Sequence, residues 1–283
     1  MESPHNAHHS VNCRGKLVDF STPKVMGIIN VNDNSFYKGS RMQSLETVRN
    51  YIIDGISHGC KIFDFGAMSS KPGSDIMEPN EEWTALHPIL TAVKNEFPDI
   101  IVSVDTVHSE TAKRSLDSGV HIINDISGGQ FDPNMMQVVS QYHVPYIMMH
   151  MQGLPKSMQE NPQYDDVTLE VMKFFAQQVT KAKETGIKDV IIDPGFGFGK
   201  TLEHNFQLLK QLRSFSIFER PVLVGISRKS MVYKPLKLNA EAALNGTSAL
   251  HMVALMKGAQ ILRVHDIEAA QQCITLFEQL RQV

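Results

Sequence analysis

Polar side chains stand at or just after the end of almost every short apolar run in this 283-residue chain. Such groups can bind a polar ligand or transfer a proton, so a set of them in one place predicts a site. The alternative is that each residue caps the following helix or turn, which would explain two or three of them. The residues are Asn30, Asp64, Asp105, Asn124 with Asp125, His150, Asp193, Ser227, and Arg263 with His265. Eight runs with such endings favour a shared site.

Two of these endings combine hydrogen-bond donors with positive charge. In GISRKSM, Ser227 and the free N–H groups of a following helix could hold a carboxylate or phosphate. Arg228 and Lys229 add positive charge there, although a solvated basic turn is an equal alternative. In ILRVHD, Arg263 and His265 pair a fixed charge with a titratable donor, which suits an oxyanion.

The segment DPGFGFGK, residues 193–200, is rich in glycine but matches neither common nucleotide-binding pattern. A phosphate-binding GxxxxGK[ST] loop would need glycine at Pro194, and the glycine spacing differs from a dinucleotide fingerprint. A backbone that approaches a flat ligand, with Phe198 stacking on it, fits better. We predict that Met149, in MMHM, lines the barrel against the same ligand.

Two turn-rich segments, IINVNDNSFYKGS and FGAMSSKPGS, include the ends of the first two apolar runs and predict loops. Two mobile loops over one rim suit a lid that closes on a substrate. Asn30, in the first segment, could ligate a hard cation or hydrogen-bond an anion.

The elements that must position these residues alternate between short apolar runs and longer amphipathic stretches. Because the strand–helix unit recurs eight times without a linker, we predict one α/β domain, a closed (β/α)8 TIM barrel with its active site at the carboxyl ends of the strands. A doubly wound open sheet is the second choice. The predicted strands are Val25–Asn30, Lys61–Asp64, Ile101–Asp105, Ile122–Asn124, Tyr146–His150, Val190–Asp193, Val222–Gly225 and Ile261–Arg263. The predicted helices include Leu45–Ser57, Glu81–Asn95, Val167–Thr185, Leu202–Leu212, Ala240–Met256 and Ile267–Leu280.

The charge, the apolar runs and the cysteines of the chain give no support for a nucleic-acid-binding, membrane or metal-binding protein. A net charge of -3 gives no electrostatic support for binding nucleic acid or an anionic membrane. The apolar runs are too short to cross a bilayer, and the N-terminus lacks an apolar signal core, so we expect a cytoplasmic protein. Cys13, Cys60 and Cys273 are expected to be buried rather than metal-bound. Residues 1–23 are predicted to form a flexible leader or a short hairpin, and residues 24–283 the barrel.

The chain contains a series of longer motifs: VMGIIN, SVDT, INDISGG, MMHMQGLPKSMQ, DPGFGFGK, GISRKSM, NGTSAL and RVHD. In order and spacing they resemble the motifs of the dihydropteroate synthases, a family of pterin-binding enzymes. The likeness runs from about Lys24 to the C-terminus. It implies a homodimeric transferase of folate biosynthesis and a sulfonamide target. The implied reaction condenses 6-hydroxymethyl-7,8-dihydropterin pyrophosphate with p-aminobenzoate to give 7,8-dihydropteroate and pyrophosphate.

The resemblance also implies roles for individual residues. Those implied for pterin binding are Asp105, Asn124, Met149, Asp193, Phe198 and Lys229. Those implied for the pyrophosphate are Asn30, Arg263 and His265, with Mg²⁺ as the cofactor and Asn30 as its ligand. Those implied for p-aminobenzoate are Phe36, Ser70, Lys71, Pro72 and Ser227. The implied mechanism is dissociative: pyrophosphate leaves first, and the aromatic amine attacks the resulting methylene cation. The catalytic residues are then Asp33, Asn34 and Lys229.

The two loops depart from the family pattern. The usual T-P-D-S-F is replaced by residues 32–36, NDNSF, so an amide at Asn34 takes the place of a carboxylate unless Asp33 substitutes for it. The usual E-S-T-R-P-G is replaced by residues 68–73, MSSKPG, so Lys71 keeps the charge of arginine without its bidentate fork. Three alternatives stay open: a pterin-binding methyltransferase, a catalytically impaired paralogue, and an unrelated phosphate-binding barrel enzyme.

Overall fold

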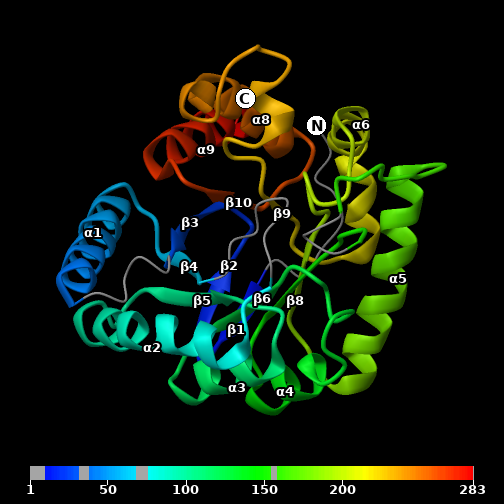
Figure 1. The fold of residues 1–283 in the computed structure, drawn as a ribbon. Helices are drawn as coiled ribbons and strands as arrows, with labels where there is room; N and C mark the ends of the chain where they lie inside the picture. Colours follow the sequence, from blue (N-terminus) through cyan, green and yellow to red (C-terminus); the bar gives the residue numbers. More distant parts are fainter. Residues whose placement is uncertain (1–9, 32–37, 68–75, 154–157, 283) are drawn as a thin grey trace.

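The structure is a computed structural model that describes residues 10–31, 38–67, 76–153 and 158–282. Its centre is an eight-stranded parallel sheet in the order β8-β7-β6-β5-β4-β3-β10-β9 (Figure 1). The strands are β3 (Lys24–Asn30), β4 (Ile62–Gly66), β5 (Ile101–Asp105), β6 (Ile122–Asp125), β7 (Tyr146–Met149), β8 (Val190–Asp193), β9 (Leu223–Val224) and β10 (Ile261–Val264).

A parallel bridge between Ile192 and Val222 joins the two ends of the sheet. The Ile192 N–H also donates to the Pro221 carbonyl at 3.0 Å, beside this bridge. The sheet is therefore closed, which confirms the predicted TIM barrel, and the alternative of an open doubly wound sheet is wrong.

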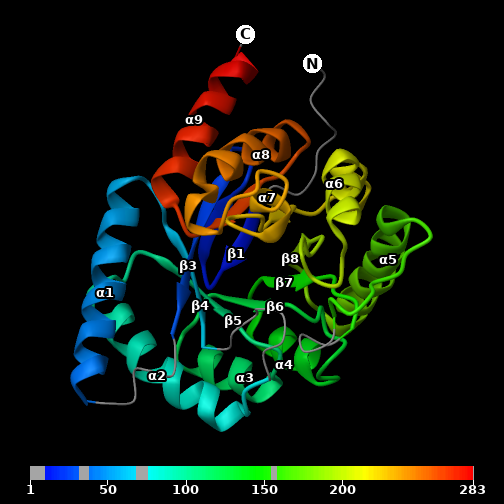
Figure 2. The same ribbon diagram turned by 45° about the horizontal axis from the view of Figure 1, so that its top comes forward.

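Helices cover the outside of the barrel (Figures 1 and 2). They are α1 (Lys38–Ser57), α2 (Pro79–Glu96), α3 (Ser109–Asp117), α4 (Met135–Tyr142), α5 (Val167–Thr185), α6 (Leu202–Lys210), α7 (Ser230–Tyr233), α8 (Leu244–Met256) and α9 (Ile267–Gln282), with 3-10 turns η2 (Leu212–Phe218) and η3 (Glu241–Ala243). The predicted helix Ala240–Met256 thus begins with the 3-10 turn η3, whereas α6 ends at Lys210, two residues before the predicted end at Leu212, where η2 begins. In the described part of the chain, no helix has both the length and the apolar character needed to cross a membrane.

Each strand presents one face to the helices and the other to the barrel interior, because successive side chains alternate. One apolar residue from each strand forms the interior layer nearest the amino ends of the strands, which we call the floor. The floor residues are Met26, Ile62, Ile101, Ile122, Ile147, Ile191, Leu223 and Ile261. The alternation places the residues two positions further along the same strands in the next interior layer. Five of the eight are polar or charged (Asp64, Ser103, Asn124, Asp193 and Arg263), and the other three are Ile28, Met149 and Gly225.

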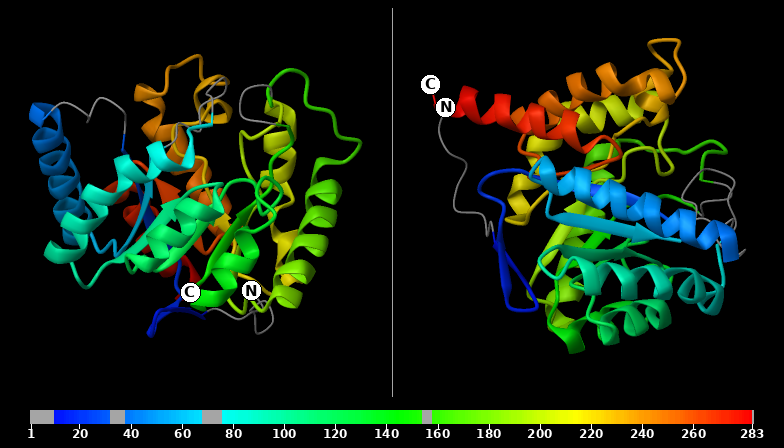
Figure 3. Two further views of the ribbon diagram at one scale, coloured as in Figure 1. Left: turned by 60° about the horizontal axis from the view of Figure 1, so that its bottom comes forward. Right: turned by 90° about the vertical axis from the view of Figure 1, so that its left-hand side faces the viewer.

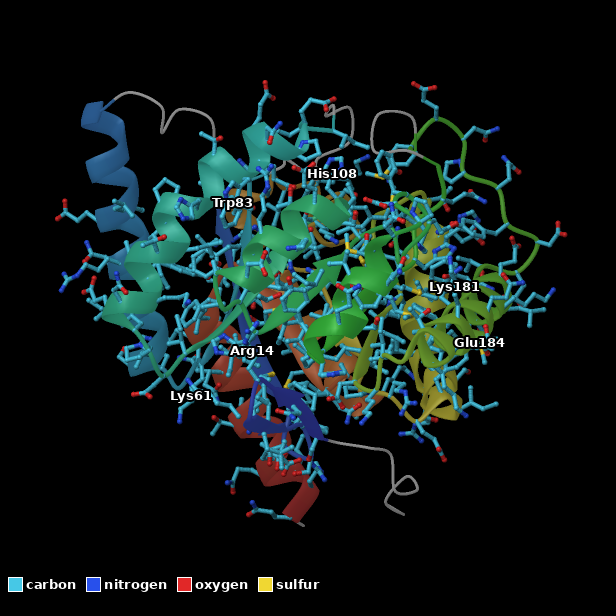
Figure 4. All side chains as sticks on the ribbon, turned by 90° about the horizontal axis from the view of Figure 1, so that it is seen from below. Arg14, Lys61, Trp83, His108, Lys181 and Glu184 are labelled. Atoms are coloured by element: carbon cyan, nitrogen blue, oxygen red, sulfur yellow. The ribbon has the colours of Figure 1, made fainter. Side chains whose placement is uncertain are left out.

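A hairpin of β1 (Ser10–Cys13) and β2 (Lys16–Asp19) covers the floor from the amino end of the strands (Figure 3). Val11, Cys13 and Phe20 pack against the floor residues. Arg14 anchors the hairpin to the end of α3 and the turn that follows it, by donating to the carbonyls of Leu116 at 3.0 Å and Val120 at 3.3 Å (Figure 4). The predicted division of the chain at residue 24 stays a prediction.

The three cysteines are free and buried, as the sequence predicted. Cys13 packs in the floor cluster, whereas Cys60 and Cys273 pack among the residues between the sheet and the helices. Burial raises the pKa of the Cys60 thiol to about 11. These thiols are therefore poor nucleophiles near neutral pH.

Candidate active site

Arg263 joins two carboxylates at the carboxyl end of the barrel. Its Nε donates to Asp64 Oδ2 at 2.7 Å, and its Nη2 donates to Asp105 Oδ2 at 2.9 Å. Asn124 Nδ2 donates to the same Asp64 oxygen at 2.8 Å. Side chains from β4, β5, β6 and β10 therefore form one hydrogen-bonded network, because parallel strands all end at the same rim.

Asp193 and Lys229 form the other half of this polar cluster. Lys229 Nζ donates to the Phe196 carbonyl at 2.7 Å and lies 4.5 Å from the centre of the Phe198 ring. A Cβ atom on Gly225 would lie 3.8 Å from Lys229 Nζ and 4.0 Å from Asp193 Oδ2. The glycine therefore lies beside both charged groups at the end of β9, where a side chain would fill the space.

Burial shifts the ionisation of these groups toward neutral pH. It raises the pKa of Asp105 to about 7, against the nearby Arg263 charge and together with the neighbouring carboxylates. It raises the pKa of Asp193 too, while Lys229 opposes the shift. Burial lowers the pKa of Lys229 to about 8, although Asp193 counteracts it. Perturbed pairs of this kind are concentrated at functional sites.

An apolar wall adjoins the polar cluster. Met149 and Phe198 are buried together with Val107, Ile126 and Met158. The arrangement offers an apolar and aromatic surface for a flat ring, with acceptors and donors beside it. The predicted pterin residues are thus brought together at one rim, and their roles toward a ligand stay predictions.

Ser227 and His265 also lie close together, after β9 and β10. Ser227 Oγ lies 3.2 Å from His265 Nδ1, and it accepts a hydrogen bond from the His265 N–H at 3.2 Å. Burial lowers the pKa of His265, and the Arg263 charge lowers it further. Asn30 is exposed at the end of β3. These residues, with Arg263, are available to a polar group above the barrel mouth.

Arg228 has a structural partner that the sequence did not reveal. Its guanidinium forms a bidentate pair with Asp266, at 2.7 Å for each bond, and Nη1 donates to the carbonyls of Ala240 and Glu241. The prediction that Arg228 adds positive charge to an anion site is therefore wrong. Its charge is neutralised in holding the turn before α7 against the start of α9.

Six predicted residues lie outside the described residues: Asp33, Asn34, Phe36, Ser70, Lys71 and Pro72. The prediction of two mobile loops falls on the same segments. Among the described residues, no group of three or more His, Cys, Asp or Glu side chains could hold a metal ion.

Two buried residues at or beside the cluster, Asp64 and Lys200, were given no specific role from the sequence. Asp64 is fully buried and accepts from both Asn124 and Arg263. Its position at a strand end was the available signal. Lys200 is also buried, and its ammonium contacts His150. No sequence signal pointed to this contact, because the two residues are 50 positions apart.

The comparisons with known proteins identify the family of the chain. The family model described as "Pterin binding enzyme" matches residues 26–265. The dihydropteroate synthases of Escherichia coli K12 and Haemophilus influenzae are 39% and 36% identical to the chain. The first alignment covers 94% of both chains, and the second covers 93% of this chain and 96% of its relative. The chain belongs to the dihydropteroate synthase family of pterin-binding enzymes.

Solved structures of this family have the same fold. The Yersinia pestis dihydropteroate synthase, solved with a sulfonamide drug complex, has a TM-score of 0.90 and 36% identity, over 97% of this chain and 100% of that one. The Xanthomonas albilineans dihydropteroate synthase, solved with 4-aminobenzoic acid, has a TM-score of 0.89 and 31% identity, over 97% and 99%.

Proposed function

We propose that this chain condenses 6-hydroxymethyl-7,8-dihydropterin pyrophosphate with p-aminobenzoate to give 7,8-dihydropteroate and pyrophosphate. The observation that carries the proposal is the rim cluster, in which Asp105, Asn124, Asp193 and Lys229 lie together beside the apolar wall of Met149 and Phe198. The family relationship supports the same reaction.

The pterin ring needs both acceptors and donors from the protein. Its aminopyrimidine edge carries N–H donors, which suit the carboxylates of Asp105 and Asp193 and the amide oxygen of Asn124. Its carbonyl and ring nitrogen are acceptors, which suit the Lys229 ammonium. Met149 and Phe198 then contact the faces of the ring, where dispersion and aromatic contacts contribute.

The diphosphate would lie toward Asn30, Arg263 and His265. Arg263 already contacts Asp64 and Asp105, so a diphosphate would share a guanidinium that these carboxylates hold in place. Asn30 offers one neutral oxygen at the exposed end of β3, which fits an Mg²⁺ ion held mainly by phosphate oxygens. When bound, Mg²⁺ supplies charge neutralisation for the leaving group.

In the proposed chemistry, the bond between the pterin methylene carbon and the diphosphate oxygen breaks with both electrons leaving on oxygen. The aromatic amine of p-aminobenzoate then forms the new C–N bond and loses one proton. No protein nucleophile is required, so the chain contributes positioning and electrostatic stabilisation. Ser227 would contact p-aminobenzoate together with Phe36, Ser70, Lys71 and Pro72. Asp33 or Asn34 would face the methylene cation.

We also propose that the chain forms a homodimer in the cytoplasm. Exposed apolar side chains occur on α8 and α9, including Met256 at 53% exposure and Leu276 at 61%. Contiguous exposed apolar surface is typical of interfaces. The three free thiols suit a reducing compartment.

A coupled assay tests the proposed reaction. Pyrophosphate release from the pterin substrate is measured with and without p-aminobenzoate, together with dihydropteroate formation. We expect release in both cases, with turnover and product only when p-aminobenzoate is present. Pterin binding without any release would support a catalytically impaired paralogue and contradict the proposal. Methyl transfer to or from a pterin would contradict it in favour of a methyltransferase.

A further inference from the structure

Lys200 is a buried ammonium for which no carboxylate contact is found within the described residues. The residue is 2% exposed. Its Nζ lies 3.0 Å from His150 Nδ1 and donates to the carbonyls of Gly195 at 2.9 Å, Phe198 at 3.1 Å and His150 at 3.3 Å. A buried charge is costly unless it is paired or well hydrogen-bonded, so an ammonium held only by neutral acceptors needs an explanation.

The backbone of the turn that precedes Lys200, residues 195–199, packs directly against the backbone of residues 150–152. Gly195, Gly197 and Gly199 have φ values of +72°, +85° and +62°, which favour glycine. A Cβ atom on Gly195 would lie 1.9 Å from the His150 carbonyl oxygen, and one on Gly199 would lie 2.3 Å from the Gln152 carbonyl oxygen. Two of the turn's carbonyls, those of Gly195 and Phe198, accept from the Lys200 ammonium, and the Gly195 carbonyl also accepts from the Phe198 N–H at 3.1 Å.

The same turn holds three parts of the pterin site. The Gly195 N–H donates to Asp193 Oδ1 at 2.8 Å. The Phe196 carbonyl accepts from Lys229 at 2.7 Å. The Phe198 ring belongs to the apolar wall and lies beside the Lys229 ammonium. A shift of this turn would therefore move an acceptor, a donor and an aromatic face together.

We propose that Lys200 is a positioning residue for pterin binding, which fixes the 195–199 turn through its carbonyls and thereby sets Asp193, Lys229 and Phe198. This inference rests on the proposed function. Lys200 itself lies behind the turn and would not contact the ligand. His150 completes the set of acceptors through its unprotonated Nδ1.

The ionisation of this pair agrees with the geometry. Burial lowers the pKa of His150 to about 2, and the Lys200 charge lowers it further, so the imidazole stays neutral and can accept. Burial also lowers the pKa of Lys200 to about 7, against the attraction of Asp193. The charged groups that influence Lys200 are thus Asp193 and Lys229, both of which belong to the site.

The test compares Lys200→Met, which removes the donors but keeps a stem of similar length, with Lys210→Met, an exposed lysine on α6. Calorimetry with 6-hydroxymethylpterin gives Kd and stoichiometry, and steady-state kinetics give KM for p-aminobenzoate. We expect Lys200→Met to weaken pterin binding at least tenfold at full stoichiometry, with KM for p-aminobenzoate within threefold of wild type. Lys210→Met should match wild type.

A merely structural role would give a different pattern. It would lower the unfolding midpoint and the binding stoichiometry, while the folded fraction kept the wild-type pterin Kd; that result would overturn the proposal. If Lys200→Met does not fold, Lys200→Gln keeps two N–H donors without a buried charge, and we expect a three- to tenfold loss of pterin affinity. Unchanged affinity in folded Lys200→Gln would equally overturn it. Absence of pterin binding in the wild type would refute the proposed function instead.

Discussion

The two ends of the barrel interior are built from the same strands but from opposite kinds of residue. At the amino end, eight apolar floor residues pack against Val11, Cys13 and Phe20 of the hairpin segment. At the carboxyl end, two residues further along, the same strands carry Asp64, Asn124, Asp193 and Arg263. One step of the strand repeat separates a layer that stabilises the fold from a layer able to bind a ligand.

The two layers also differ in the cost of burying their side chains and in how completely their polar atoms are hydrogen-bonded. Floor side chains are apolar and lose nothing on burial, whereas the rim buries several charges within one network. Among the described residues, Asp64 Oδ1 has no hydrogen-bond partner, and Asp105 and Lys229 both have pKa values shifted toward neutrality. Rim substitutions should therefore change binding more than stability, and floor substitutions the reverse.

The largest expected effect is on stability, from Phe20→Ala at the floor. Phe20 is 1% exposed, and truncation of a buried Phe costs about 3–5 kcal/mol. We expect that loss in chemical denaturation, with pterin affinity of the folded protein unchanged. Leu17→Ala in the same hairpin is the control, because Leu17 is 73% exposed. A large loss of pterin affinity in folded Phe20→Ala would break the proposed division between the two ends.

The next effect is on the diphosphate. Arg263→Ala should weaken binding of the pyrophosphate-bearing pterin about ten- to a hundredfold more than binding of the pterin alone, since charge-assisted bonds to phosphate are strong. Calorimetry with both ligands measures this difference. Arg49→Ala, at a surface pair with Glu96, should affect neither ligand. Equal losses for both ligands would show that Arg263 supports the pterin pocket or the fold instead.

A third effect is on pH dependence. Burial raises the pKa of Asp105 to about 7, and the charged carboxylate is a stronger acceptor for the pterin N–H groups than the protonated acid, so affinity should fall as pH drops below 7. The limiting slope for one proton is about tenfold per pH unit. Asp105→Asn should remove this limb and leave a flatter profile between pH 5.5 and 7.5. The same limb in the Asn variant would assign the titration to another group.

The smallest expected effect is on the pH dependence of stability, from a histidine in a helix outside both interior layers. His251 on α8 is buried, and neither ring nitrogen has a hydrogen-bond partner among the described residues. Burial lowers its pKa to about 4, against the opposing charge of Asp266. Because the folded pKa lies below the unfolded value of about 6.5, stability is full above pH 6.5 and falls between pH 6.5 and 4.

His251→Leu isolates this contribution. Between pH 7.5 and pH 5.5, the unfolding free energy of the wild type should fall by about 1 kcal/mol more than that of His251→Leu. Urea denaturation at both pH values measures the difference. Identical pH dependence in the two proteins would show that His251 does not carry this acid sensitivity.

The strands and the polar rim could be predicted because they depend on local pattern. Short apolar runs ending in Asp105, Asn124 or Asp193 identify both the strand and the side of the barrel on which the polar residue lies. The limits were also physical. The strand β9, Leu223–Val224, is shorter than the predicted Val222–Gly225, because Val222 forms only an isolated bridge to Ile192 and Gly225 already lies beyond the end of the strand.

The parts that could not be predicted depend on contacts between distant residues. The charge of Arg228 suggested an anion site, but Asp266, 38 positions away, neutralises it. Lys200 ends a glycine-rich segment for which the sequence predicted only stacking of Phe198 on a flat ligand. The contact between Lys200 and His150 arises only when the chain folds. The position of a charged side chain along the chain is known from the sequence. The residue that pairs with it depends on which segments become neighbours in the folded protein.

The most direct test of this account uses two residues of β8 that differ by one strand repeat. Asp193→Ala and Ile191→Val are titrated with 6-hydroxymethylpterin in parallel with wild type. We expect no measurable binding by Asp193→Ala at ligand concentrations about a hundredfold above the wild-type Kd, because a pterin N–H would lose its charged acceptor. Ile191→Val should bind within twofold of wild type and lose about 0.5–1.5 kcal/mol of stability. Near-native pterin affinity in Asp193→Ala would contradict the assignment of the rim as the pterin site.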